Sequence, residues 1–156
     1  MKLNYLIYYT TFDKSLLYQI NSHYSLFHYQ KNRDIYRYGS KKRQQIKYEL
    51  GYHNLVEDHH IIPKEFDNHL FIRDIGFDVG CSRNIRIMPN HYGYEKLNLT
   101  NALVHHNGHI HYNQYVKHNL DELYRTTNFD ESKYKFLLFF WYLESQLDYK
   151  GDLPWL

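Results

Sequence analysis

The segment Glu57–Pro63, "EDHHIIP", places two adjacent histidines behind an acidic pair and ahead of an apolar run that ends in proline. A short apolar run closed by proline is typical of a strand that leads into a turn. Successive side chains of a strand point to opposite faces. We therefore expect His59 and His60, at the start of this strand, to point in opposite directions. One imidazole can then face a metal ion while its neighbour faces a substrate.

The sequence after this segment predicts a second strand and then a helix. The segment "NIRIMP" at residues 84–89 is another short apolar run ended by proline, and residues 77–83 supply the turn between the two strands. Further on, apolar side chains recur at helical spacing at Tyr112, Tyr115, Val116, Leu120 and Leu123. Glycine is a poor residue for a helix interior, so this helix is expected to begin near Asn107–Gly108, with Asn107 as N-cap.

Histidines concentrate in this strand–strand–helix region, which holds ten of the twelve in the chain. His105 and His109 are four residues apart and can converge on one point even where the helix begins between them. Together with His59 they would form a three-histidine site that leaves a coordination position open, as in catalytic metal sites. Apart from His60, we interpret the other six in this region as structural or surface residues: His53, His69, His91, His106, His111 and His118.

His60, which faces away from the ligand side, is left as a candidate general base that acts on water. Its pKa is expected to lie near enough to neutrality for that role. Asn84, at the start of the second predicted strand, is placed to orient it. Three neutral imidazoles suit Zn²⁺, Ni²⁺ or Mn²⁺ better than Mg²⁺, which prefers oxygen ligands. Mg²⁺ becomes plausible if Asp58 binds the ion or if only two histidines do.

Helical patterns flank this region on both sides. Residues 13–50 read as helical with an interruption at Gly39–Ser40, and residues 130–149 read as a further helix that is amphipathic to buried. The run "KKRQQIK" at residues 41–47 is strongly basic. It is interpreted either as a solvated helix face or as an arm in which Lys41, Lys42 and Arg43 track phosphates.

Length and composition narrow the class of protein. A chain of 156 residues corresponds to about one domain. We divide it into a basic helical region at 1–50, a core at 51–125, and a C-terminal helix and tail at 126–156. One cysteine excludes an internal disulfide framework. The absence of a long apolar run and of a signal-peptide cleavage pattern favours an intracellular, non-secreted protein in a reducing compartment. A net charge of +2 argues only weakly for a nucleic-acid partner.

The segments "DHHIIP", "GFDVGCSRNIRIMP" and "HHNGHIHYNQYV" together resemble the HNH nucleases, whose fold is the ββα-metal (His-Me) finger. Within these nucleases the chain is most similar to the branch named for its Ala-His-His motif. The resemblance covers about residues 58–123 and implies an α+β fold, a ββα-metal core with helical flanks. One departure is Asp58, which stands where that branch has alanine, so this acid could join the site as a ligand or as the partner of a ligand.

The resemblance implies a metal-dependent endonuclease that hydrolyses phosphodiester bonds, with DNA as the expected substrate. It puts His60 at the base position, Asn84 at the orienting position, and His59 and His109 at ligand positions. His105 matches the first histidine of the helix motif. The implied cofactor is one divalent ion, which would stabilise charge at the phosphate.

Two arginines next to Asn84 extend this interpretation. Arg83 and Arg86 could clamp neighbouring phosphates. Two other functions stay open from the sequence. One is a metal-stabilised nucleic-acid-binding module without turnover. The other is a toxin nuclease that acts on a rival cell and needs an immunity partner.

Overall fold

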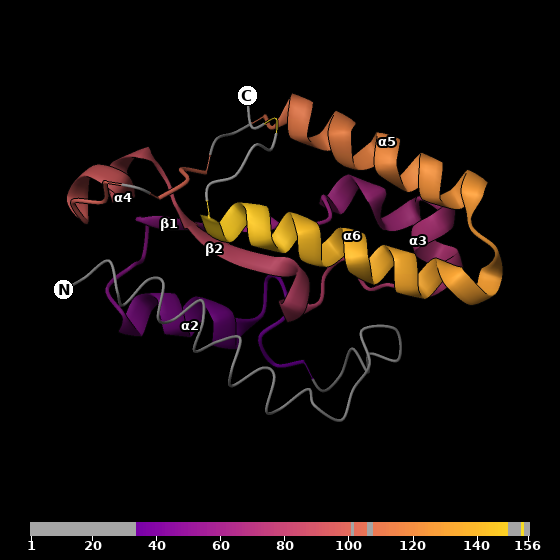
Figure 1. The fold of residues 1–156 in the computed structure, drawn as a ribbon. Coiled ribbons are helices and arrows are strands. Elements are labelled where there is room, and N and C mark those ends of the chain that lie inside the picture. The colour runs from indigo at the N-terminus through magenta and orange to yellow at the C-terminus, as the bar shows by residue number, and fades with distance from the viewer. Residues whose placement is uncertain (1–33, 101, 106–107, 150–153, 155–156) are drawn as a thin grey trace.

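The computed structural model describes residues 34–100, 102–105, 108–149 and 154 (Figure 1). The helical pattern expected before residue 34 and the expected N-cap Asn107 lie outside these residues. In order, the elements are α2 (Lys41–Glu49), β1 (Val56–His60), η2 (Lys64–Asn68), α3 (Leu70–Ile75), η3 (Ser82–Asn84), β2 (Ile85–Pro89), α4 (His91–Lys96), α5 (Ile110–Thr126) and α6 (Phe129–Tyr149).

Strands β1 and β2 form a two-stranded antiparallel sheet in which His59 lies opposite Arg86 and His60 opposite Ile85. The histidines end β1, whereas the sequence predicted that they would begin it. The reason is that Ile61 and Ile62 leave the ladder for the core, where both are fully buried. Beyond His60 the backbone bonds to Asn84, whose carbonyl oxygen accepts from the Ile61 N–H and whose side-chain Oδ1 accepts from the Ile62 N–H, both at 2.8 Å.

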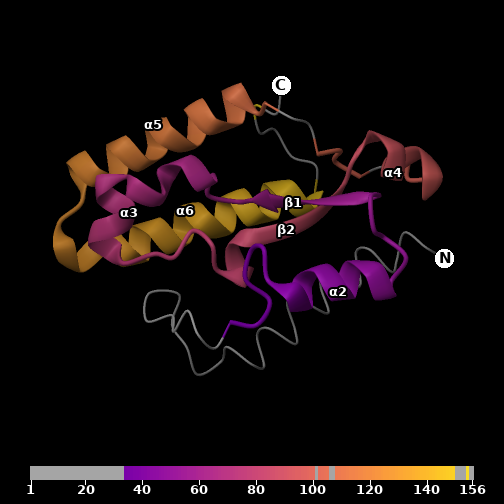
Figure 2. The same ribbon diagram turned by 180° about the vertical axis from the view of Figure 1, so that it is seen from behind.

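Helices enclose this small sheet. Figures 1 and 2 show α6 crossing one face of the two strands, with α5 and α2 on opposite sides of them. Buried side chains recur every three or four residues along α5 and α6, so each helix presents one apolar stripe to a shared core. These residues are Tyr112, Val116 and Leu120 on α5, and Phe136, Phe140, Leu143 and Leu147 on α6. The helix expected at residues 130–149 is therefore confirmed.

The first residues of α5 connect this helix to the sheet. It begins at Ile110, with His109 as N-cap, two residues later than predicted. Gly108 has φ of +88°, a left-handed conformation that favours glycine, and it turns the chain into the helix. In the first turn of α5, the buried Tyr112 hydroxyl donates to the Ile61 carbonyl oxygen at 2.5 Å. This bond ties the first turn of α5 to the segment that follows β1.

Sheet and helix together form the α+β architecture of a ββα unit, which confirms the predicted fold class. The sequence interpretation did not include η2, α3 or the short helix α4. Within the described residues, α6 shares the main core with α3 and α5, while the division into three regions stays a prediction. Among the same residues, no helix combines the length and the apolar character that crossing a bilayer requires.

Candidate active site

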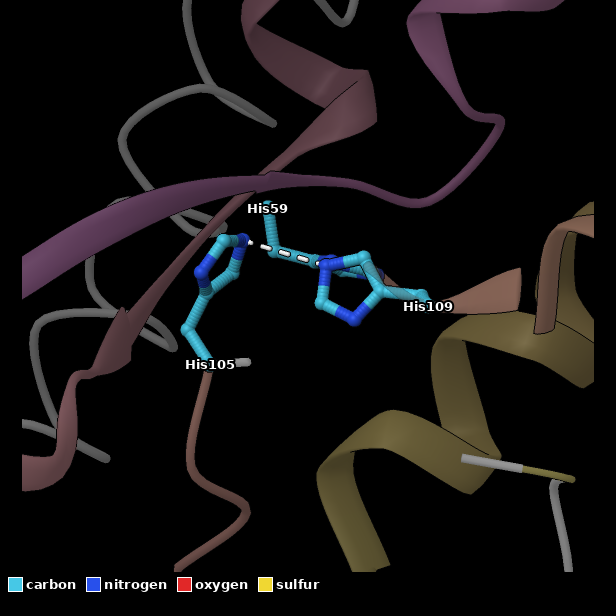
Figure 3. Close-up of side chains that lie close together, drawn as sticks. All are labelled: His59, His105 and His109. Carbon is cyan, nitrogen blue, oxygen red and sulfur yellow. Dashed lines mark hydrogen bonds between the residues drawn. The ribbon is translucent and has the colours of Figure 1, made fainter. Parts of the chain in front are cut away.

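Three histidines from separate parts of the fold meet beside β1 (Figure 3). His59 comes from the strand itself and is only 2% exposed. His105 lies in the segment before α5, where its backbone N–H donates to the Pro89 carbonyl oxygen at 2.7 Å. His109 caps α5. The sheet thus fixes two of the three imidazoles, and the helix start fixes the third.

The spacing of these imidazoles suits a single small ion. Their ligand atoms all lie within 4.8 Å of one another. The Nε2 atoms of His105 and His109 lie 3.4 Å apart, as the dashed line in Figure 3 marks. Two nitrogens bound tetrahedrally at the usual Zn–N length would be separated by about 3.3 Å. Three imidazoles form a donor set that suits Zn²⁺ and Ni²⁺.

Burial keeps the strand histidine neutral. It lowers the pKa of His59 well below its usual 6.5, and positive charge on His109 and His105 would lower this pKa further. Only the unprotonated imidazole binds a metal. His59 is therefore in the ligand state at neutral pH.

Glu57, which the sequence interpretation did not select, is the acid that supports this cluster. It is two residues before His59 and shares its face of β1. Its Oε2 lies 2.7 Å from Nδ1 of His105, which leaves the Nε2 of that ring directed at His109. A carboxylate behind a histidine ligand fixes the tautomer and the orientation of the ring. The signal available in the sequence was this two-residue spacing on a strand.

Asp58, selected as a possible ligand or partner of a ligand, points elsewhere. It lies on the opposite face of β1, where its Oδ1 accepts from Arg43 Nε at 2.9 Å and lies 2.8 Å from Lys47 Nζ. Both cations come from α2. Asp58 is not part of the histidine cluster. Strand alternation turns this side chain toward α2, and a role for Asp58 beside the metal stays a prediction.

His60 occupies the same face as Asp58 and is half-buried. Its ring meets the edge of Tyr38, with ring centroids 4.5 Å apart. Burial lowers the pKa of His60 to about 4, although the nearby Asp58 carboxylate acts in the opposite direction. This pKa is lower than the sequence interpretation expected, because desolvation outweighs the acid. The imidazole is neutral at pH 7 and can accept a proton.

A pocket of about 210 Å³ brings the two faces of β1 together. Residues from both faces of the strand line it, and His59 and His60 are among them. Its lining consists of Asp58, His59, His60, Pro63, Lys64, Glu65, His105, His109 and Asn113. Asn113 lies one turn beyond His109, and its buried Oδ1 has no hydrogen-bond partner in the described part of the chain. A buried oxygen without a donor is costly in a dry site and fits one that holds an ion.

Asn84 acts on the backbone and not on the His60 ring. It is fully buried, and its Nδ2 donates to the carbonyl oxygens of Ile62 at 2.9 Å and Val79 at 2.7 Å. Those two bonds use both of its amide hydrogens. Asn84 thus holds the chain just after His60 in place, and any influence on the imidazole passes through that backbone.

The arginines expected to bind phosphates are engaged within the protein. Arg43 is 3% exposed and bonded to Asp58. Arg86 is also buried, with its guanidinium 3.2 Å from Glu144 of α6, and Arg83 lies 3.6 Å from the same carboxylate. Each guanidinium is paired with a carboxylate on a neighbouring helix or strand, and phosphate binding by these arginines stays a prediction. Lys41 and Lys42 are exposed on α2 and stay predicted phosphate contacts.

Comparison with known proteins supplies the family. No curated protein and no solved structure matches the chain. Residues 40–135, more than half of the chain, match the model of a nuclease family of the HNH/ENDO VII superfamily with a conserved AHH motif. The match spans α2, both strands, α5 and all four histidines of the pocket. The chain belongs to this AHH nuclease family.

Proposed function

We propose that this nuclease is a metal-dependent endonuclease that hydrolyses phosphodiester bonds, with DNA as its substrate and His60 as its general base. One observation carries the proposal. The imidazoles of His59, His105 and His109 converge beside β1. The neutral imidazole of the adjacent His60 lines the same pocket. A centre that stabilises negative charge and a proton acceptor beside it can together accelerate phosphodiester hydrolysis.

The metal centre in this proposal consists of His59, His105 and His109. When bound, the ion would act as a Lewis acid that stabilises negative charge at the phosphate and on the departing oxygen. Glu57 would hold His105 in the ligating tautomer, because its carboxylate would accept a hydrogen bond from Nδ1–H and leave Nε2 free to bind the ion. The identity of the ion is left to experiment among Zn²⁺, Ni²⁺, Mn²⁺ and Mg²⁺.

His60 would take one proton from the attacking water. The water oxygen forms the new bond to phosphorus, and the bond to the 3′ oxygen breaks on the opposite side. The products are a 5′-phosphate and a 3′-hydroxyl, with the 3′ oxygen protonated from solvent. The Nε2 of His60 has no hydrogen-bond partner among the described residues, so no other described group competes for this nitrogen. The anionic phosphate would raise the pKa of this imidazole from about 4 toward the working pH.

The test is cleavage of supercoiled plasmid DNA by the purified chain, first in chelator and then with each of the four divalent ions. We expect nicked or linear product with at least one ion and none in chelator. A non-catalytic binding module would retard the plasmid without cutting it under any of these conditions. That outcome would replace the endonuclease proposal.

A further inference from the structure

Several arginines and lysines of the described residues pair with carboxylates of the protein itself. Arg43 and Lys47 pair with Asp58, Arg37 pairs with Asp78, and two further arginines pair with Glu144. A guanidinium or ammonium already engaged by a carboxylate must give up that partner before it can bind a phosphate. These five cations are therefore not free to bind a substrate phosphate without losing an ion pair.

Lys64 is the exception at the pocket itself. It is exposed, begins η2 directly after Pro63, and is the sole lysine or arginine among the described residues that line the pocket. Its Nζ lies 5.2 Å from the centroid of the Tyr38 ring. Within the described part of the chain, no carboxylate forms an ion pair with it.

Tyr38 links this ammonium to the candidate base. The same ring lies under Lys64 and meets the edge of His60. A cation–π contact of this kind restrains the long lysine side chain without neutralising its charge. The lysine charge is thereby kept at the His60 side of the pocket, and the histidine cluster lies on the other side of β1.

We propose that Lys64 binds a non-bridging oxygen of the phosphodiester to be cleaved. This inference rests on the proposed function and adds the residue that anchors the substrate. The phosphate would be held between the Lys64 ammonium and the histidine cluster, with its phosphorus presented to a water beside His60. An ammonium is a compact charge with three rotatable donors, so it can follow a phosphate as the geometry at phosphorus changes.

Lys96 offers a matched control. It is also exposed, and its Nζ lies 5.9 Å from the centroid of the Tyr92 ring, but it is outside the pocket. The variants to compare are Lys64→Gln, Lys64→Arg and Lys96→Gln. Their affinity for a short fluorescein-labelled DNA duplex is measured by anisotropy in chelator, which prevents cleavage, over a series of salt concentrations. Single-turnover cleavage of the same duplex is then measured with the activating ion.

For Lys64→Gln we expect the slope of log affinity against log salt to fall by about 0.9, the value for one phosphate contact. Its single-turnover cleavage rate at subsaturating protein should drop roughly ten- to hundredfold, as for loss of one charged hydrogen bond. Lys64→Arg should keep the slope, and Lys96→Gln should match the parent in both measurements. Metal content should be the same in all four proteins.

The proposal is overturned if Lys64→Gln and Lys96→Gln have equal slopes and equal cleavage rates while the parent cuts. If the parent fails to cut with any ion, the endonuclease proposal fails and the salt slopes alone decide the role of Lys64. Equal slopes in that case also overturn it.

Discussion

Glu57 and Asp58 are neighbours on β1 and carry the same charge, yet they serve different parts of the molecule. Glu57 lies against the histidine cluster, 2.7 Å from Nδ1 of His105. Asp58 lies against α2, where Arg43 and Lys47 bind it. The histidines that follow repeat the division, with His59 on the first face and His60 on the second. The comparison teaches that strand alternation, and not residue type, assigns the roles in "EDHH".

Exchanging the two acids for their amides should separate these roles. Glu57→Gln removes the carboxylate behind a ligand and should weaken metal affinity by roughly 10- to 100-fold. Asp58→Asn should leave metal affinity unchanged. Isothermal titration with Zn²⁺ would measure both. Equal losses of affinity in the two variants would mean that the faces of β1 are not distinct.

The same two substitutions should affect stability in the reverse order, with the larger loss for Asp58→Asn. Asp58→Asn leaves the buried Arg43 guanidinium without its carboxylate, a change that costs on the order of 3 kcal/mol in the free energy of unfolding. Glu57 is partly exposed, so its amide should cost much less. Urea unfolding of the chelator-treated proteins would measure the difference.

The histidines of the site could be predicted from the sequence, but the residues that hold the site in place could not. Adjacency and a four-residue spacing are local patterns, so the three ligand candidates and the neighbouring base candidate follow from them. The partner of His105 depends instead on the bond that draws its segment to Pro89, and this bond joins parts of the chain that are distant in sequence. The pairing of Arg86 with Glu144 likewise depends on where α6 packs.

The end of β1 could not be predicted for a related reason. Ile61 and Ile62 are apolar and buried, so they look like strand residues in the sequence. Whether a buried residue belongs to a strand depends on where its backbone hydrogen bonds go. Here the Ile62 N–H donates to the side-chain Oδ1 of Asn84. The spacing of apolar residues indicates which residues are buried. It does not show where their backbone hydrogen bonds go.

A third expected effect is the dependence of stability on pH through His60. In the metal-free protein the pKa of His60 is about 4, below its usual 6.5, while Asp58, Lys64 and Arg43 supply the nearby charges. The unfolded chain therefore binds a proton in this interval that the folded chain does not. The contribution of His60 to stability is fully present above pH 6.5 and is lost as the pH falls through 4.

Urea unfolding of the chelator-treated parent and of His60→Gln, between pH 7 and pH 4, measures this contribution. The parent should lose stability more steeply than the variant as the pH falls. Parallel curves would indicate that the folded protein lets His60 titrate at its ordinary pKa.

The central claim is that adjacent imidazoles divide the work, with His59 on the metal and His60 on the water. The most direct test is single-turnover cleavage by His60→Ala, with metal content and duplex affinity measured on the same sample. We predict parental metal content, parental affinity and a cleavage rate lower by roughly a hundredfold or more. His59→Ala should instead lose the metal. A His60→Ala protein that cleaves at the parental rate, or that loses its metal, would contradict the division.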